Sequence, residues 1–413
     1  MIERNKYRGI GNITEWLFVL LCFCYPISAV LSLFLSIDST LFNTGYRALA
    51  LLFSVFVLLK LPYVKKENNI AIHLLFIFFL FYLFRIFYDI GFKGMEVAYF
   101  RLFSFYIGNI VLPIFTLVKA FKFIDIQRLL RRIFKTLIIA NILILFAFFY
   151  QQNFSFSPEV LLGRAEVKIG EKDSLVNSIT YSLYGGYLFL LCFSLLVFQI
   201  KNISKNKIRL FFFLFLGIIN LLLGSSRGPL LSTFLAIVVF LLQYFLYVKK
   251  KNIFKLGLIV VLVSIVISYS FTYLNENNFQ LGIIERMLKF SDDMHYGEKE
   301  GRISLYGKAF DFFEESPILG KQFMFDNGAY PHNMVLEVLM ALGLIGFLLY
   351  LSVILFYLKR IFDIYRIGKF YVPIVFISVL SFGLTMTTGN IYENVEFWNI
   401  MAFVLLVPLK HKK

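Results

Sequence analysis

Long apolar stretches alternate with short polar ones along the whole chain. Most of the apolar stretches are about 20 residues long, which is the length of helix that crosses the hydrocarbon core of a bilayer. Backbone groups cannot stay unpaired in lipid, so such stretches are expected to be helices. The pattern predicts about twelve spans, at residues 16–37, 42–59, 70–88, 100–118, 136–151, 177–199, 210–224, 229–248, 254–274, 332–358, 370–388 and 392–409.

The composition agrees with this pattern. Of the 413 residues, 59% are hydrophobic and only 16% are charged, and 52 are phenylalanine. A soluble protein of this length would need separate cores joined by polar linkers, and the recurring apolar stretches leave no room for them. We therefore predict an all-α, polytopic integral membrane protein that forms a single membrane domain over residues 1–413.

The basic residues are concentrated in alternate connections between the predicted spans. If the N-terminus lies in the cytoplasm, most of the 41 Lys and Arg residues fall in cytoplasmic connections, which retain such residues. The same orientation leaves most carboxylates outside and places both termini in the cytoplasm. It also explains the net charge of +16. A nucleic-acid partner is not predicted, because no soluble basic domain is present.

Two connections on the predicted outer side are long, the outer loop at residues 152–176 and the large outer loop at residues 275–331. The large outer loop contains two stretches with apolar residues at helical spacing, residues 279–290 and 301–320. In the 301–320 stretch the apolar side chains near one face are Ile303, Tyr306, Phe310 and Phe313. We expect short amphipathic helices that lie on the membrane surface or over the mouth of a cavity.

The stretch GSSRG, residues 224–228, follows the seventh predicted span on the same outer side. It places Arg227 in a short turn between two apolar helices, with Pro229 well placed to begin the second. The turn is too short to carry Arg227 far from the interface, and the flanking glycines allow a ligand to approach the backbone. This pattern indicates an anion site. The alternative is a loop arginine that reaches for lipid headgroups.

The stretch YPHN, residues 330–333, precedes the tenth predicted span. Pro331 can begin a helix there, and the partial positive charge of a helix N-terminus disfavours an imidazolium. His332 is therefore expected to be neutral and able to accept a proton. The alternative is a capping or interfacial histidine. Arg302 begins the predicted amphipathic stretch at 301–320 and is a second candidate cation, although surface arginines of such helices are usually solvated.

Three further arginines fall within or beside predicted spans, namely Arg47, Arg85 and Arg101. A guanidinium at membrane depth normally faces a polar cavity or a partner. Asp89 stands four residues after Arg85, so these two side chains can neutralise each other on one helix face. Arg47 has no such neighbour in the sequence.

Motifs for nucleotide or metal chemistry do not occur. The sequence contains no GxxxxGK[ST], HExxH or CxxC pattern, and Asp292 and Asp293 are adjacent rather than alternating. Neither a metal nor a cofactor is predicted. Any anionic group on the outer face would have to be bound by the arginines.

Three pieces of the sequence together resemble the O-antigen polymerase and O-antigen ligase family. They are the SRG turn at Ser226–Gly228, the segment GRISLYGKAFDFFEESPILG at residues 301–320, and PHNMVLEVLMALGLIGFLLYL at residues 331–351. The resemblance covers roughly residues 210–355, the family-like catalytic region. The chain departs from the family pattern at Tyr306, where a tryptophan is usual, and after Gly320, where Lys321 replaces the start of a Gly-x-Gly.

The resemblance implies a metal-independent glycosyltransferase of the bacterial inner membrane, whose substrates are glycans linked to undecaprenyl diphosphate. It implies that Arg227 and Arg302 stabilise negative charge on the diphosphate, and that His332 is the base or orients the acceptor hydroxyl. Membrane lipids and a chain-length regulator are further candidate partners. The residues expected to bind substrate are Ser226, Asn333, Tyr306, Arg47, Arg101 and Arg286.

Three functions remain open at this point. A polymerase would transfer the glycan to another lipid-linked repeat unit, whereas a ligase would transfer it to lipid A core. We favour the polymerase because its family members more often have a poorly matched N-terminal half and a bias towards Phe, Ile, Lys and Asn. A secondary transporter would also fit twelve spans, but it predicts an internal repeat with polar breaks at mid-membrane, and the polar residues here cluster at the outer interface.

Overall fold

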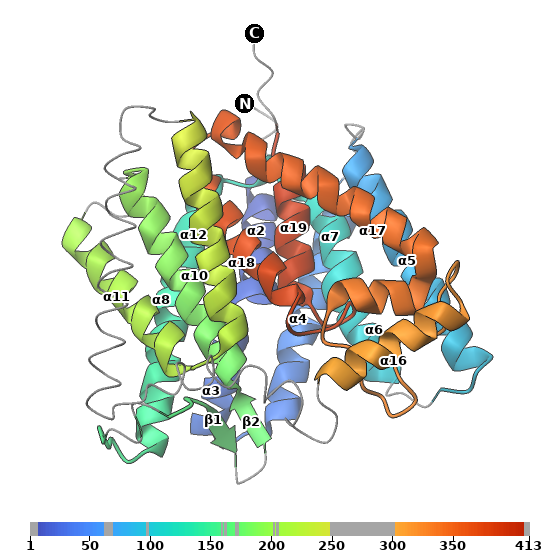
Figure 1. Ribbon diagram of the computed structural model, residues 1–413. Coiled ribbons are helices and arrows are strands. Elements are labelled where there is room, and N and C mark those ends of the chain that lie inside the picture. The colour runs from blue at the N-terminus through green and yellow to red at the C-terminus, as the bar shows by residue number, and fades with distance from the viewer. Residues whose placement is uncertain are drawn as a thin grey trace.

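A computed structural model of the chain describes residues 7–61, 69–95, 99–157, 160, 163–169, 173–200, 203, 206–247 and 302–408. Most of its helices run up and down the bundle, and α17 crosses them obliquely (Figure 1). In chain order the elements are α2 (Arg8–Phe23), α3 (Tyr25–Phe34), α4 (Ser39–Lys60), α5 (Ile70–Gly91), α6 (Tyr99–Phe103), the π-helix η1 (Ser104–Val111), α7 (Leu112–Ala120), the 3₁₀ helix η2 (Phe121–Phe123), α8 (Ile126–Gln151), β1 (Val167–Ile169), β2 (Asp173–Val176), α10 (Ser178–Val197), α11 (Lys207–Leu223), α12 (Arg227–Tyr247), α16 (Arg302–Glu315), α17 (Met334–Ile367), α18 (Val372–Thr385) and α19 (Val395–Leu406).

The predicted membrane character is confirmed by the lengths of the described helices. Six are long and apolar enough to cross a bilayer, at Leu41–Lys60, Ile70–Gly91, Ser104–Phe123, Ile126–Gln151, Ser178–Val197 and Met334–Asp363. The pair α2 and α3 makes a seventh if it is counted as one bent span. The predicted span at 254–274 lies outside the described residues, so the total of twelve stays a prediction.

The first predicted span, residues 16–37, is two helices rather than one. The chain bends by 71° between α2 and α3 at Cys24. Pro26 explains the break, because a proline cannot donate the helical hydrogen bond to the carbonyl four residues earlier. That carbonyl belongs to Cys22, and it instead accepts a hydrogen bond from the Tyr184 hydroxyl of α10 at 3.4 Å. The carbonyl that loses its helical partner at the bend is therefore hydrogen-bonded by a neighbouring helix.

The two ends of the bundle differ in their polar contacts. At one end Glu15 of α2 accepts two hydrogen bonds of 2.7 Å from Arg128 of α8 and pairs with Arg132 at 3.2 Å. At the other end of α8, Gln151 donates to the carbonyl of Lys168 at 2.6 Å. The beginning of α2 and the end of α19 lie at the first end, opposite the strands (Figure 1). We refer to the end that carries the strands as the outer end, following the predicted topology.

One element departs from the predicted all-α class. β1 and β2 form an antiparallel hairpin inside the predicted outer loop at 152–176, with Val167 opposite Val176. The hydroxyl of Tyr25 in α3 donates to the carbonyl of Leu175 at 3.1 Å, which fixes the hairpin to the bundle. The apolar pattern does not reveal two strands this short, because three or four residues give no period.

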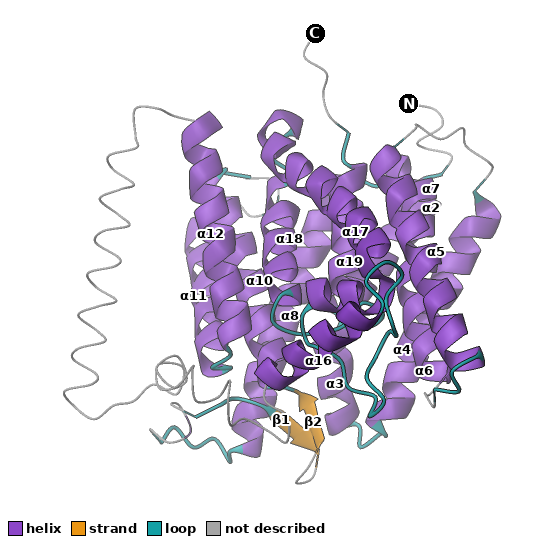
Figure 2. Ribbon diagram, turned by 45° about the vertical axis from the view of Figure 1, so that its right-hand side comes forward, coloured by secondary structure: helices purple, strands orange, loops and turns teal. Residues whose placement is uncertain are grey.

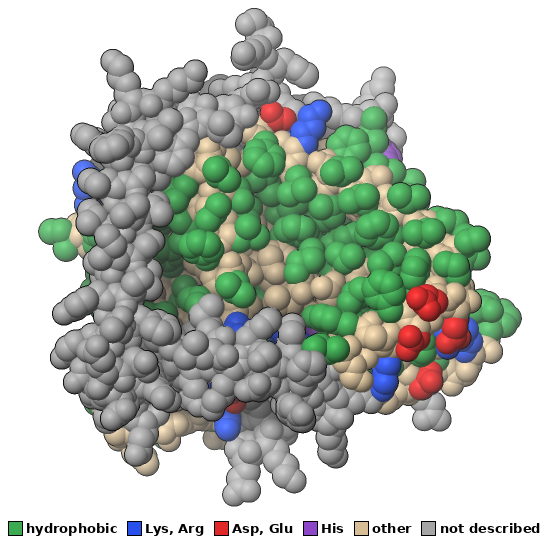
Figure 3. Space-filling model, in the orientation of Figure 1, with side chains coloured by type: hydrophobic (Ala, Val, Ile, Leu, Met, Phe, Trp, Pro, Cys, Tyr) green, Lys and Arg blue, Asp and Glu red, His purple; other side chains and the backbone are tan. Residues whose placement is uncertain are grey.

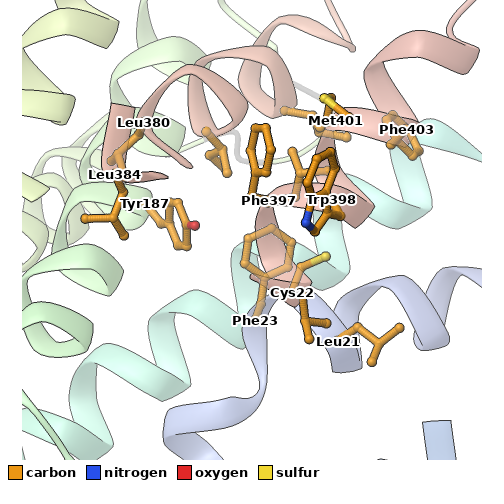
Figure 4. Close-up of a cluster of buried hydrophobic side chains, with 14 of the residues drawn as sticks. Leu21, Cys22, Phe23, Tyr187, Leu380, Leu384, Phe397, Trp398, Met401 and Phe403 are labelled. Atoms are coloured by element: carbon orange, nitrogen blue, oxygen red, sulfur yellow. The ribbon is translucent and has the colours of Figure 1, made fainter. Parts of the chain in front are cut away.

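The core lies where α2, α10, α18 and α19 meet. Trp398 of α19 is fully buried there, and its indole N–H donates to the carbonyl of Ile391 at 2.8 Å. Burial of the ring places a large apolar surface in the protein core, while its N–H group stays hydrogen-bonded. Figure 4 shows the cluster of buried side chains to which Trp398 belongs, with Leu21, Cys22, Phe23, Tyr187, Leu380, Leu384, Phe397, Met401 and Phe403.

The described part of the large outer loop, residues 302–333, lies against α17 (Figure 2). The predicted helix at 301–320 is present as α16 and ends at Glu315, but a different face is buried. Leu305 and Ala309 pack with Met340 of α17, whereas Ile303 and Phe310 of the predicted apolar stripe are exposed. The stripe is therefore available to lipid, as a surface helix requires. The predicted helix at 279–290 lies outside the described residues.

Candidate functional site

The GSSRG stretch forms a tight turn at the outer end, between α11 and α12. Arg227 is the first residue of α12 rather than part of the turn, and Pro229 stands in the first helical turn, as expected from its fixed φ. Ser225 has a φ of 47°, and Ser226 is buried with 6% of its surface exposed. A Cβ on Gly224 would lie 2.8 Å from the carbonyl oxygen of Ser178 in α10. Only glycine fits this close approach.

The predicted outer loop at 152–176 packs on this turn. The amide of Ala165 donates to the carbonyl of Leu223 at 2.9 Å, and the Ser225 hydroxyl donates to the carbonyl of Gly163 at 3.4 Å. These contacts place Arg164 at the beginning of α10, where it bonds Ser178 and pairs with Glu166. No pattern in the sequence points to Arg164, since its position depends on the fold of the loop.

The YPHN stretch caps α17. The helix begins at Met334, not at Pro331, because the Asn333 side chain accepts hydrogen bonds from the amides of Val335 at 3.0 Å and Leu336 at 3.2 Å. An asparagine cap of this kind satisfies two amides that the helix leaves unpaired. The expectation that the proline starts the helix is thus wrong. His332 precedes the cap with a φ of 53°, and its ring centroid lies 4.3 Å from that of Tyr330.

The two motifs meet at the end of α18. The side-chain amide of Asn333 donates to the carbonyl of Met386 at 3.1 Å. One residue later, the Thr387 hydroxyl oxygen lies 2.7 Å from the position of a Cβ on Gly228, so α12 also abuts this turn. We call the region formed by residues 224–228, 332–333 and 384–387 the motif junction. It brings together residues 224–228 and 332–333, which are more than 100 residues apart in the sequence.

Glu337, which the sequence reading did not single out, holds the same turn from the other side. This carboxylate of α17 is fully buried, and it accepts hydrogen bonds from the Tyr82 hydroxyl at 3.0 Å and from the amide of Ile391 at 3.0 and 3.1 Å. It therefore ties α5, α17 and the connection between α18 and α19 together. A single acid in an otherwise apolar span was the signal that could have identified it.

A second polar region at the outer end involves Arg85, which we call the loop clamp. Arg85 pairs with Asp89 at 3.3 Å, as its spacing predicts. Arg85 also donates hydrogen bonds to the carbonyls of Leu319 and Gly320, each at 2.5 Å. Asp89 accepts a hydrogen bond from the amide of Phe323 at 2.9 Å. The intramembrane arginine thus binds the backbone of the outer loop, which is a structural role.

The loop clamp also contains a break in α17. Gly343 has a φ of 61° and a ψ of −158°, so the helical ladder is interrupted there. The loop replaces the missing partners, since Lys321 donates to the carbonyl of Met340 and Leu344 donates to the carbonyl of Pro317, both at 2.8 Å. A Cβ on Gly343 would lie 2.6 Å from the amide nitrogen of Gly320. Pro317–Gly320 and Gly343–Gly346, which belong to the family-like segments 301–320 and 331–351, are therefore the two halves of one close contact.

The other predicted site residues are placed as follows. Arg302 and Tyr306 lie on α16, Arg302 exposed as its first residue and Tyr306 half-buried. Charged side chains gather over α16, and the neighbouring face over α12, α17 and α18 is largely apolar (Figure 3). The Arg47 guanidinium lies 3.7 Å from the centroid of the Phe105 ring. Arg101 belongs to α6, but its side chain and the whole of Arg286 lie outside the described residues.

Among the described residues, no three His, Cys, Asp or Glu side chains lie close enough together to hold a metal ion. What the motif junction does offer is a guanidinium at the beginning of α12 and an imidazole beside the beginning of α17. Helix N-termini carry a partial positive charge, so both places favour an anion.

Comparison with known proteins gives one family match. Residues 211–351 match the sequence model of the O-antigen ligase family, and this range contains Arg227, Arg302 and His332. No curated protein and no solved structure matches the chain. The chain is thus a multi-pass membrane protein whose residues 211–351 match the O-antigen ligase family, which points to an enzyme of O-antigen or polysaccharide assembly.

Proposed function

We propose that the protein polymerises oligosaccharide repeat units linked to undecaprenyl diphosphate, at the outer face of the bacterial inner membrane. The observation that carries the proposal is the motif junction, where Asn333 and Gly228 contact consecutive residues at the end of α18. Because of this contact, the arginine next to Gly228 and the histidine next to Asn333 can act on one substrate.

The proposed reaction is a glycosyl transfer. A hydroxyl oxygen of the acceptor sugar attacks the anomeric carbon of the donor, and a new C–O bond forms there. The bond between that carbon and the diphosphate oxygen breaks, so undecaprenyl diphosphate leaves with the electron pair. His332 takes the hydroxyl proton or orders the hydroxyl for attack. Arg227 and Arg302 stabilise the negative charge that grows on the diphosphate, without a metal ion or another cofactor.

The remaining predicted residues support binding. Ser226 and Asn333 shape the backbone at the junction, and Tyr306 lies on α16, the helix that begins with Arg302. Arg47, Arg101 and Arg286 complete the set of candidate substrate contacts. Membrane lipids surround the bundle, and a regulator of chain length is a further candidate partner.

The alternative within the same chemistry is a ligase that transfers the glycan to lipid A core. The match to the family is confined to residues 211–351, so the N-terminal half offers no family signature for the acceptor. We favour the polymerase for the compositional reason given above. A transporter is a weaker alternative, because the matched region is of an enzyme family and the polar motifs lie at the outer end.

The function is tested with purified protein and lipid-linked repeat units extracted from the producing cells. A polymerase extends the lipid-linked glycan into a ladder, whereas a ligase forms product only when lipid A core is added. Arg227→Ala should abolish the ladder. A full ladder from this variant would reduce Arg227 to an arginine that contacts headgroups.

The orientation is tested by labelling single cysteines, in a background without Cys22, Cys24 and Cys192. The exposed residues Lys168, in the hairpin, and Lys207, at the beginning of α11, lie in connections predicted to face opposite sides of the membrane. In spheroplasts, an impermeant maleimide should label Lys168→Cys at once and Lys207→Cys only after lysis. The reverse pattern would place the motif junction in the cytoplasm and end the proposal.

A further inference from the structure

A third polar region, separate from the motif junction and the loop clamp, lies at the outer end between α3, α4 and the beginning of α19. It consists of Tyr25 of α3, Tyr46 and Arg47 of α4, and Glu396 of α19. Arg47 covers the ring of Phe105 in η1 at 3.7 Å, and η1 lies beside α19, because the side-chain amide of Asn399 donates to the carbonyl of Asn109 at 3.0 Å. Glu396 lies one turn before Asn399, and Phe105 lies one turn before Asn109, so Glu396 and Arg47 lie against the same part of η1. We call Tyr25, Tyr46, Arg47 and Glu396 the Arg47–Glu396 group.

The exposure of Glu396 shows that this group adjoins open space. The residues on both sides of it in α19, Val395 and the run from Phe397 to Leu405, are buried, whereas Glu396 is partly exposed. Tyr25, Tyr46 and Arg47 are also half-buried. Two opposite charges are costly to keep between apolar helices, and such residues usually serve a substrate.

The group is placed beside the motif junction. Tyr25 is attached to the outer hairpin through the carbonyl of Leu175. Glu396 begins α19 directly after the connection that starts at Met386, the residue bonded by Asn333, and that contains Ile391, the residue bonded by Glu337. The group and the junction thus lie at the two ends of one short connection, residues 386–394.

The chemistry of the group fits a sugar better than a diphosphate. A carboxylate accepts hydrogen bonds from sugar hydroxyls, a guanidinium donates to hydroxyl and ring oxygens, and aromatic side chains cover the apolar face of a sugar ring. A diphosphate would be repelled by Glu396. The Phe105 ring, whose centroid lies 3.7 Å from the Arg47 guanidinium, also fixes the position of that group.

We propose that Tyr25, Arg47 and Glu396 bind the glycan of the acceptor, while the motif junction binds the diphosphate of the donor. The proposal rests on the proposed function and assigns its two substrates to separate places. It specifies Arg47, a candidate substrate contact of the proposed function, as a residue that binds sugar hydroxyls. It also explains why an acid is kept beside a site whose other substrate is anionic.

The test measures binding of the free oligosaccharide that mild acid releases from extracted lipid-linked repeat units. This probe has no diphosphate, so it can accept but cannot donate. Equilibrium dialysis against the purified protein should show binding that Glu396→Gln and Arg47→Met each weaken by at least about tenfold, as expected when a hydrogen bond to a charged group is lost. Glu314→Gln, an exposed acid of α16, should bind like the unchanged protein.

The double variant Arg47→Met with Glu396→Gln distinguishes binding from a structural ion pair. If the two side chains only neutralise each other, removing both restores binding, and the proposal is overturned. Unchanged binding in both single variants also overturns it. Dialysis requires no glycosyl transfer, so a wild-type protein that binds the oligosaccharide but makes no glycan would contradict the proposed function and leave this site standing. Size-exclusion elution identifies any variant that has not folded, and Arg47→Lys then provides a milder substitution with the same expected direction.

Discussion

The motif junction and the loop clamp both place arginines and glycines at the outer end of the bundle, yet they use them differently. In the loop clamp, Arg85 donates to backbone carbonyls of Leu319 and Gly320, and Gly343 lets the loop enter a broken helix. In the motif junction, the fixing contacts are made by Asn333 and by the backbone at Gly228, and these carry His332 and Arg227 as their neighbours. Arg85 binds backbone and so maintains the fold. Arg227 and His332 instead stand next to the residues that make the fixing contacts, so their own side chains can act on a substrate.

The largest expected effect is that of His332→Ala. If His332 is the base, turnover should fall by about 10²- to 10⁴-fold, the usual contribution of a positioned base, while folding stays nearly intact. His332→Gln is the sharper probe, since glutamine can hydrogen-bond but cannot take the proton. Single-turnover assays with lipid-linked repeat units measure both. Activity retained in the glutamine variant and lost in alanine indicates orientation, and normal synthesis by both removes His332 from the mechanism.

Arg227→Lys should follow in size. Lysine keeps the charge but loses the planar pair of donors that matches a phosphate group, so turnover should fall by about 10²- to 10³-fold, as for the loss of one donor to a developing negative charge. Glycosyl transfer is measured at saturating donor to separate this loss from weaker binding. Arg209→Lys, at the opposite end of the bundle on α11, is the matched control and should leave transfer unchanged. Equal activity of the two variants would contradict the role given to Arg227.

Arg85→Met should instead destabilise the protein. It removes donors from the loop carbonyls and one of the two cations that pair with the buried Asp89, since Lys93 remains at 3.4 Å. We expect a cost of about 3 kcal/mol, the lower end of the range for breaking a buried charge pair. Thermal unfolding in detergent should show a lower Tm, and the surviving folded protein should still transfer glycan. Arg131→Met, an exposed arginine of α8, should unfold like the unchanged protein. A stable Arg85→Met protein without activity would move Arg85 from the clamp into the catalytic machinery.

The smallest effect distinguishes the two contacts of Asn333. Asn333→Ala loses the helix cap and the bond to Met386, so stability should fall by about 1 kcal/mol. Asn333→Asp keeps the cap, since an acid is favoured at a helix N-terminus, but places an oxygen against the Met386 carbonyl. We expect Asn333→Asp to unfold at the normal Tm and to transfer glycan more slowly. Normal transfer by Asn333→Asp would show that the bond to Met386 does not position His332.

The periodicity of the chain predicted the elements better than it predicted their breaks. Long apolar stretches gave helices close to the expected bounds, as for α5 at Ile70–Gly91 against the predicted 70–88. The bend at Cys24 follows from one proline, and the break at Gly343 follows from a loop that arrives from outside the helix. Hydropathy contains no information on either, because both depend on which backbone hydrogen bond a neighbour replaces.

The candidate site was predictable only where short motifs carried it. Arg227 and His332 were found from glycines, a proline and their position at span ends, and Arg85–Asp89 from its spacing. Glu337 and Arg164 depend on contacts with Ile391 and Ser178, which lie 54 and 14 residues away in the sequence. A single sequence does not show which residues these side chains contact, although an acid in an otherwise apolar span marked Glu337. The face of α16 that packs on the bundle could not be predicted for the same reason, because its partner is Met340 of α17.

The central claim is that Arg227 and His332 serve one transition state at the motif junction. A double-mutant cycle tests it most directly, with glycosyl transfer measured for Arg227→Lys, His332→Gln and the two combined in purified protein. Residues that act as a unit give strongly non-additive losses, so the combined variant should be little slower than the slower single variant. If the two losses simply multiply, the residues act independently, and the motif junction is not the place where the glycan is transferred.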